Sequence, residues 1–203
     1  MAESATRQIF NLYLIKPSHY DDDGYVIQWV RSSIPANTLA ALYGLALDCA
    51  DRHVLGSDVD IRITTWDETN TRIRTDRIID EMRAAGGLGL VALVGVQTNQ
   101  FPRAVDLARP LIAAGLPVAI GGFHVSGCLA MLPDTPPDLR DAMTLGITLF
   151  AGEAEGRLED LLKAACAGTL EPLYNFMNDL PGLEGAPTPY LPRAVVNRTG
   201  GVR

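Results

Sequence analysis

The stretch G-G-F-H-V at residues 121–125, directly after the apolar run Pro117–Ile120, decides the fold. A short unbroken apolar run is typical of a buried parallel strand. A double glycine at the end of such a strand lets the backbone approach a bulky flat ligand closely, because no Cβ intervenes. Two further glycine-containing stretches, Gly95–Gln100 and Gly152–Glu155, each follow an apolar run. Because the carboxyl ends of parallel strands meet at one edge of a sheet, we expect these three turns to line a ligand site there.

Strand patterns and helix patterns alternate five times along the chain. The expected strands are Ile9–Ile15, Asp58–Thr65, Leu88–Val96, Pro117–Ile120 and Ile147–Ala151. The expected helices cover 37–51, 75–85, 102–114, 128–132, 138–144 and 156–167. This alternation predicts an α/β fold, a doubly wound Rossmann-like or flavodoxin-like sheet of five parallel strands with helices on both faces.

The character of each strand predicts its place in the sheet. The first, third and fourth are unbroken apolar runs, as expected of central strands buried on both faces. The second alternates, with Val59, Ile61 and Ile63 separated by polar residues, which is typical of an edge. The fifth is short, and we place it at the other edge. The predicted order is 2-1-3-4-5, with the ligand crevice where the first and third strands diverge.

The chain changes character after Gly168. Five prolines punctuate residues 169–203, and no helical period survives there. We therefore expect two parts, a Rossmann-like domain over 1–168 and a Pro-rich extension over 169–203. The aromatic and aliphatic residues of the extension indicate that it lies on a surface, and we expect more protein to follow it.

Composition excludes several classes of protein. The formal charge of −7 and the scattered Lys and Arg residues argue against nucleic-acid binding. The longest apolar run, Leu88–Val96, is far shorter than the roughly 20 residues needed to span a membrane. The polar N-terminus lacks the apolar segment of a signal peptide, so we expect a cytoplasmic protein. Cys49, Cys128 and Cys166 form no C-x-x-C pair, so neither a zinc knuckle nor a disulfide framework is indicated.

A few polar residues follow the expected strands closely enough to contact a ligand. His124 is either a hydrogen-bonded loop histidine or a donor to a ligand amide or phosphate. Thr98 and Asn99 begin the third helix, where a cap and a ligand contact are compatible. There is no G-x-G-x-x-G after the first strand, no phosphate-binding P-loop and no G-x-S-x-G elbow. The sequence therefore lacks a complete catalytic apparatus, and whether the chain belongs to an enzyme stays open.

Four stretches together resemble the N-terminal cobalamin-binding domain of B12-dependent radical SAM proteins. They are I-K-P-S-H-Y-D-D-D-G-Y-V-I-Q-W at 15–29, G-V-Q-T-N-Q at 95–100, G-G-F-H-V-S-G at 121–127 and A-G-E-A-E-G at 151–156. The segment D-L-P-G-L-E-G-A-P-T-P-Y at 179–190 resembles the linker that precedes the catalytic barrel in such proteins. Each motif is short, and their order and spacing on one five-strand pattern carry the resemblance.

The resemblance implies a cobalamin that lies across the carboxyl edge of the sheet, with its nucleotide tail running down into the fold. By motif, the residues around it would be Thr98, Asn99, Gln100, Gly121, Gly122, Phe123, His124, Gly152 and Glu153. A radical SAM barrel, in cis or in trans, would be the partner.

Two motifs of related proteins are missing. The D-x-H-x-x-G motif of other cobalamin domains, which supplies a histidine below cobalt, is not matched by S-H-Y-D-D-D-G at 18–24. Cobalt would then have no histidine below it, or it would have another ligand, for which His19 is the candidate. The C-x-x-x-C-x-x-C motif is absent as well, so a [4Fe-4S] cluster and S-adenosylmethionine would belong to a C-terminal domain outside this chain.

The resulting hypothesis is a cobalamin-binding module of a B12-dependent radical SAM enzyme, methyltransferase-type or otherwise, that does not turn over alone. The alternative is a cobalamin-free Rossmann-like domain used for docking or regulation. Under the first hypothesis, a bulky side chain at Gly122 should block the ligand while the chain stays folded.

Overall fold

A computed structural model describes residues 7–182 and 184–199 of the chain. The expectations placed on residues 1–6, on Leu183 within the linker-like segment and on residues 200–203 lie outside these residues. The strands are β1 (Gln8–Lys16), β2 (Val59–Asp67), β3 (Gly89–Leu93), β4 (Val118–Gly121), β5 (Thr148–Ala151) and β6 (Leu173–Asn175). The helices are α1 (Asn37–Asp51), α2 (Thr75–Ala84), α3 (Phe101–Ala113), α4 (Phe123–Met131), α5 (Pro137–Thr144), α6 (Leu158–Ala167) and α7 (Arg193–Val196), and the 3-10 turn η1 (Thr98–Gln100) precedes α3.

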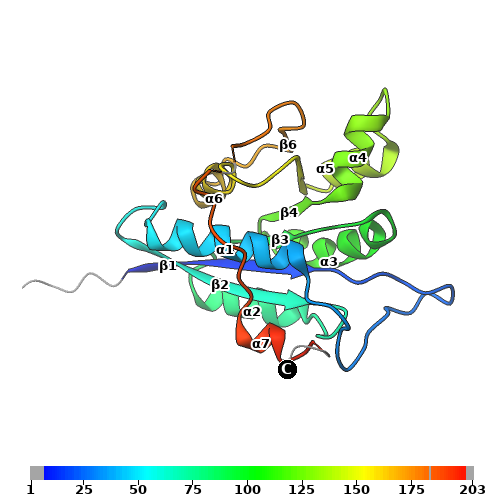
Figure 1. Ribbon diagram of the computed structural model, residues 1–203, viewed down its shortest axis with the longest axis horizontal. Coiled ribbons are helices and arrows are strands. Elements are labelled where there is room, and N and C mark those ends of the chain that lie inside the picture. The colour runs from blue at the N-terminus through cyan, green and yellow to red at the C-terminus, as the bar shows by residue number, and fades with distance from the viewer. Residues whose placement is uncertain (1–6, 183, 200–203) are drawn as a thin grey trace, which may run out of the picture.

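All six strands form one parallel sheet in the order β2-β1-β3-β4-β5-β6 (Figure 1). The predicted α/β class and the order of the first five strands are confirmed, whereas the predicted number of strands is wrong. The sixth strand has three residues and pairs with β5 in the register Leu149↔Leu173. Three residues are too few for an alternation to stand out, and the neighbouring Pro172 is typical of a loop.

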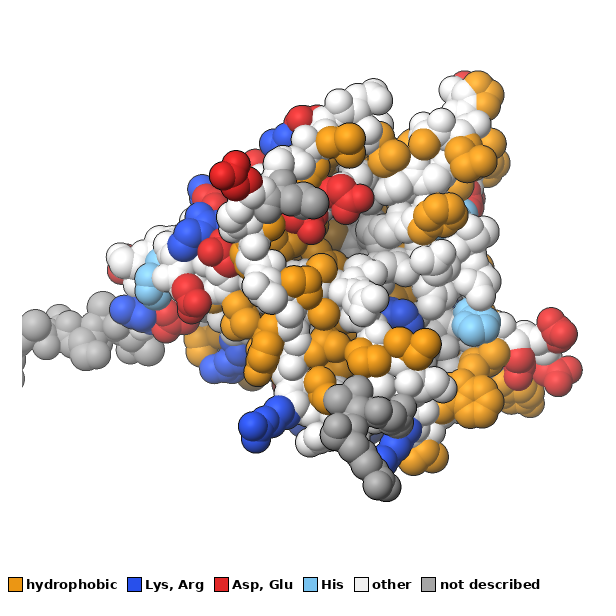
Figure 2. Space-filling view, viewed as in Figure 1, with side chains coloured by type: hydrophobic (Ala, Val, Ile, Leu, Met, Phe, Trp, Pro, Cys, Tyr) orange, Lys and Arg blue, Asp and Glu red, His pale blue; other side chains and the backbone are white. Residues whose placement is uncertain are grey.

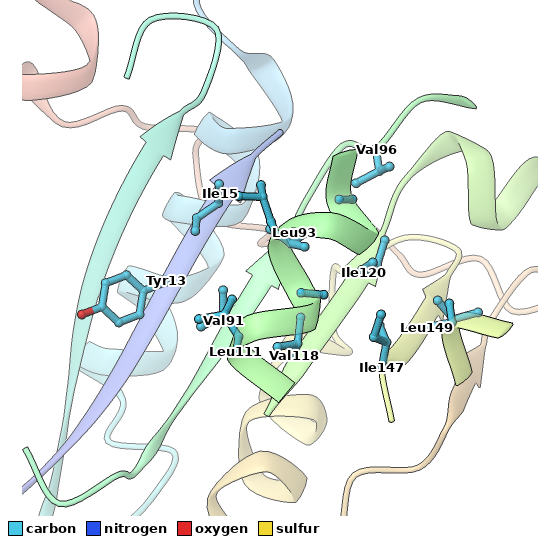
Figure 3. Close-up of a cluster of buried hydrophobic side chains, with 14 of the residues drawn as sticks. Tyr13, Ile15, Val91, Leu93, Val96, Leu111, Val118, Ile120, Ile147 and Leu149 are labelled. Atoms are coloured by element: carbon cyan, nitrogen blue, oxygen red, sulfur yellow. The ribbon is translucent and has the colours of Figure 1, made fainter. Parts of the chain in front are cut away.

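Each face of the sheet carries its own hydrophobic core. Neighbouring residues of β1 point into different cores. Tyr13 and Ile15 belong to the core beneath α2, α3, α4 and α5 (Figure 3). Leu12 and Leu14 belong to the core beneath α1 and α6. Within β1 and β3, every residue from Phe10 to Ile15 and from Gly89 to Leu93 is buried. This explains why both strands are almost entirely apolar there, although β1 also contains the buried Asn11.

The segment after β6 packs on the outside of α1, as its apolar residues led us to expect (Figure 1). The Tyr190 amide donates to the Ala40 carbonyl over 2.9 Å, and the rings of Tyr190 and Tyr43 lie 5.8 Å apart. At Gly44, a Cβ would lie 2.6 Å from the Thr188 carbonyl oxygen, so α1 has a glycine where this segment crosses it. The chain therefore returns from β6 across α1 toward the β2 side of the sheet.

The loop between β1 and α1, residues 17–36, is tied to the sheet by a buried ion pair. Glu68, whose side chain is 1 % exposed, pairs with Arg103 of α3, with 2.6 Å between Oε1 and Nη2. The same carboxylate accepts the Ser18 amide over 3.0 Å, and the Tyr20 hydroxyl donates to Asp106 over 2.7 Å. These contacts fix the base of the loop against α3.

No helix in the part of the chain that the structure describes has the length and apolar character that a membrane crossing requires.

Candidate functional site

The three glycine-containing turns lie on one edge of the sheet. β3, β4 and β5 are neighbouring parallel strands, so the turns that follow them leave the sheet in the same direction. The turns meet at a cavity of about 530 Å³, which Gly95, Gly121 and Gly152 all line. The expected convergence of these turns is therefore present.

The cavity lies between the sheet and the helices α1 and α6. Its floor consists of strand residues that face this side of the sheet, namely Leu14, Ala92, Val94, Ala119 and Phe150. Its walls are Ala41, Leu42 and Leu45 of α1 and Leu158 and Leu161 of α6. Every one of these side chains is apolar, so the deep part of the cavity favours an apolar group.

The polar lining residues gather at the mouth. They are Asn37, Thr38, Gln97, Ser126, Glu153 and Glu155. Each lies in the first turns of α1 or α4 or in a turn after a strand, which places it at the carboxyl edge. Among the described residues that line the cavity, the charged ones are Glu153 and Glu155, and none is Lys, Arg or His. A polyphosphate nucleotide would therefore meet negative charge without a cation, whereas neutral amides would find partners.

Five of the nine residues expected around the ligand line this cavity: Gly121, Gly122, Phe123, Gly152 and Glu153. The walls supplied by α1 and α6 were missed. Their alanines and leucines have the same pattern as a core-facing helix side, which the sequence alone does not distinguish from a cavity wall. The one available signal for a site at α1 is the pair of polar residues Asn37 and Thr38 at the start of the helix. The N-cap of α1 is Ala36, and no side chain makes a capping hydrogen bond, so neither Asn37 nor Thr38 is used as a cap.

Thr98, Asn99 and Gln100 lie away from this cavity. Gln100 is buried, and its Oε1 accepts the Gln97 amide over 2.9 Å, which closes the η1 turn. Thr98 lies beside His124, with 3.4 Å between Oγ1 and Nδ1, and Asn99 is exposed. The structure therefore places these three residues outside the lining of the cavity.

His124 is a buried link between α4, η1 and α5. Its ring is in contact with Phe101 at a centroid distance of 4.4 Å, and its Nε2 lies 2.8 Å from Asp138 Oδ2. The His124 amide also donates to the Val96 carbonyl over 2.9 Å. The ring thus faces away from the 530 Å³ cavity. Of the two expected roles of His124, this corresponds to a histidine that is hydrogen-bonded within the protein rather than to a donor to a ligand.

Cys128 contacts the same histidine without being activated by it. Its Sγ lies 3.9 Å from Nδ1 and 4.0 Å from Nε2 of His124, so the sulfur faces the ring rather than one nitrogen. Burial, and secondarily the charge of Asp138, raises the pKa of the Cys128 thiol. A raised pKa favours the protonated thiol over the nucleophilic thiolate.

Gly122 is required by the protein's own packing. Its φ is +141°, and a Cβ there would lie 2.2 Å from the Val96 nitrogen and 2.7 Å from the Gly95 carbonyl carbon. The expectation that a bulky residue at this position leaves the chain folded is therefore wrong. The double glycine lets the turn after β4 approach the turn after β3, which in turn shapes the rim of the cavity.

His19, the suggested alternative cobalt ligand, lies in the β1–α1 loop and is not a lining residue of the cavity. Its carbonyl accepts the Ile27 amide over 2.9 Å. Within residues 7–182 and 184–199, no three His, Cys, Asp or Glu side chains are grouped closely enough to hold a metal ion.

Comparison with known protein families, curated proteins and solved structures finds no match to this chain.

Proposed function

We propose that this chain is a cobalamin-binding module of the kind that B12-dependent radical SAM enzymes contain. The observation that supports this is the cavity of about 530 Å³ beneath three glycine-containing turns, with an apolar floor and a polar mouth. A corrinoid has the matching chemistry, a large ring edged with neutral amides and a nucleotide tail that ends in a flat aromatic base. The apolar floor and the polar mouth match the aromatic base and the amide groups of a corrinoid.

The mouth would hold the amide edge of the ring. Asn37, Thr38, Gln97 and Ser126 offer donors and acceptors there, and Glu153 and Glu155 accept from amide N–H groups. The floor would take the aromatic base. No histidine is among the described residues that line the cavity. When bound, cobalamin supplies a cobalt that carries a methyl group or undergoes other cobalt chemistry, and the protein contributes its position.

A partner would be expected on the same edge. The β1–α1 loop exposes Tyr25, Trp29, Val30 and Ile34 at 73 %, 66 %, 94 % and 74 %, and hydrophobic side chains gather beside the acidic tip of that loop in Figure 2. In the proposed enzyme, a radical SAM barrel with its [4Fe-4S] cluster and S-adenosylmethionine would pack there. The same exposed residues favour the second candidate function, a docking or regulatory domain without cobalamin.

Retention of cobalamin distinguishes the cobalamin-binding module from the docking or regulatory domain. Protein mixed with hydroxocobalamin and desalted should keep about one equivalent of the red chromophore, measured by visible absorbance. The variant Ala119→Leu fills the floor of the cavity and should lower retention at least tenfold while the chain stays folded, because the cavity has room for the added atoms. Ala113→Leu, the same change on the exposed face of α3, is the matched control and should retain the chromophore.

A colourless wild-type protein would favour the docking domain. Equal retention by Ala119→Leu and Ala113→Leu would show that cobalamin binds elsewhere, and would contradict the placement in this cavity.

A further inference from the structure

We propose that two copies of this chain pair through their β1–α1 loops, with the acidic tip of each loop against arginines at the base of the other. This inference goes beyond the proposed function, because it names a second copy of the chain as an occupant of the exposed loop surface. A second copy and a radical SAM barrel would use the same surface, so they would exclude each other. Self-association would then compete with the partner expected in the proposed enzyme.

The middle of the loop surface is apolar. The side chains of Tyr25, Trp29, Val30 and Ile34 are each exposed by two thirds or more. In Figure 2, hydrophobic side chains gather directly beside the acidic tip of the loop. Monomeric proteins seldom expose several large apolar side chains close together, and such patches mark sites of protein association. The exposed middle of the loop therefore favours burial against another protein surface.

The tip of the loop carries three negative charges in a fixed turn. Residues 20–26 form a hairpin that is closed by an antiparallel bridge between its first and last residue. The Asp21 carboxylate accepts the amide N–H groups of Asp23 and Tyr25 over 3.1 and 2.8 Å, which holds the turn in shape. No ion pair within the described part of the chain involves Asp21, Asp22 or Asp23. The tip is therefore preorganised and ready to meet cations.

The base of the loop carries three exposed arginines. The Ser32 amide donates to the Arg198 carbonyl over 3.0 Å, and Arg198 Nη1 donates to the Thr71 hydroxyl over 3.0 Å. Arg31 directly precedes the serine, and Arg72 directly follows the threonine. All three arginines are exposed, and none pairs with a carboxylate among residues 7–182 and 184–199. The base thus offers the charge that the tip lacks.

The order of these three parts makes the surface complementary to itself. Acidic tip, apolar middle and basic base follow one another as the chain runs from residue 21 to residue 32. A twofold axis through the apolar middle brings the tip of each copy to the base of the other, so the charges pair twice. A partner with a purely basic surface would meet the arginines with like charge. Charge complementarity therefore favours the second copy.

Sedimentation velocity over roughly 1 to 100 μM protein measures the pairing. The wild-type chain should shift from monomer to dimer as its concentration rises. Val30→Asp should weaken the dimer by roughly tenfold or more, because it places a charge in the buried middle. Val30 is 94 % exposed, so the substitution should leave the fold intact. The matched control is Met131→Asp at the end of α4, where the side chain is 79 % exposed, and it should leave the dimerisation constant unchanged.

A charge exchange tests the arrangement of tip and base. The tip variant combines Asp22→Arg with Asp23→Arg and keeps Asp21, whose carboxylate holds the turn. The base variant combines Arg31→Glu with Arg72→Glu. Each variant alone should dimerise more weakly by roughly tenfold or more, because like charges then meet at both contacts. An equimolar mixture should dimerise as the wild type does, because opposite charges meet again at both contacts.

The outcomes keep this inference apart from the proposed function. A wild-type chain that stays monomeric at the highest concentration overturns the pairing and leaves the surface to another protein. A dimer that Val30→Asp does not weaken, or a mixture that does not restore the dimer, overturns the pairing through these loops. None of these measurements uses cobalamin, so a failure to retain hydroxocobalamin counts against the proposed function alone.

Discussion

Replacing Gly122 with alanine should lower the free energy of unfolding by roughly 3–5 kcal/mol. The added Cβ would lie 2.2 Å from the Val96 nitrogen and 2.9 Å from the Val96 oxygen, and both are backbone atoms that no rotamer change can move. The φ of +141° adds strain for any residue with a side chain. Urea unfolding followed by circular dichroism measures the change.

Gly127 offers a control within the same G-G-F-H-V-S-G motif. It lies inside α4, and a Cβ there would come no closer than 3.6 Å to the Phe123 ring, which is an ordinary contact. Gly127→Ala should therefore stabilise the chain by about 0.5–1 kcal/mol, because glycine is unfavourable within a helix. Equal stability of the two variants would contradict the packing described for the turn after β4.

Substituting Glu68 with glutamine should lower the free energy of unfolding by roughly 3 kcal/mol. The carboxylate is 1 % exposed and accepts hydrogen bonds from Arg103 and from the Ser18 amide. Glutamine keeps the size but removes the negative charge, so the guanidinium, 19 % exposed, loses its counter-ion. Removing one partner of a buried ion pair leaves the other charge uncompensated, and that is the source of the large effect.

The control is an ion pair on the surface. Asp60 pairs with Arg7 at 2.9 Å, and the two side chains are 49 % and 54 % exposed. Asp60→Asn should change the stability by less than about 1 kcal/mol, because water screens the pair. Similar urea midpoints for Glu68→Gln and Asp60→Asn would show that the base of the β1–α1 loop does not depend on the buried pair.

Much of the sheet could be predicted from the sequence, because strands that are buried on both faces consist mainly of apolar residues. β3 is apolar without interruption, β1 is apolar from Phe10 to Ile15 except at Asn11, and β2 alternates, which placed these strands correctly. The prediction fails where a strand is too short to show a periodic pattern of apolar and polar residues. β6 is three residues long and follows Pro172, so its pairing with β5 depends on tertiary contacts that no local pattern encodes.

The site was predicted less completely, for two physical reasons. A glycine indicates that something approaches the backbone closely, but the sequence does not show whether this is a ligand or another part of the chain. At Gly122 it is the backbone of Gly95 and Val96. A cavity wall and a core-facing helix side use the same residues, so Leu42 and Leu45 gave no separate signal. The polar residues next in sequence to the turn after β3 were assigned to the ligand, whereas Gln100 closes its own turn.

The most direct test of the proposed site is a methyl NMR spectrum of alanine-labelled protein, recorded with and without hydroxocobalamin. The Ala92 and Ala119 methyl groups, on the cavity floor, should shift, and those of Ala104 and Ala151, in the core on the opposite face, should stay in place. Unchanged Ala92 and Ala119 signals at saturating hydroxocobalamin, or shifts confined to Ala104 and Ala151, would contradict it.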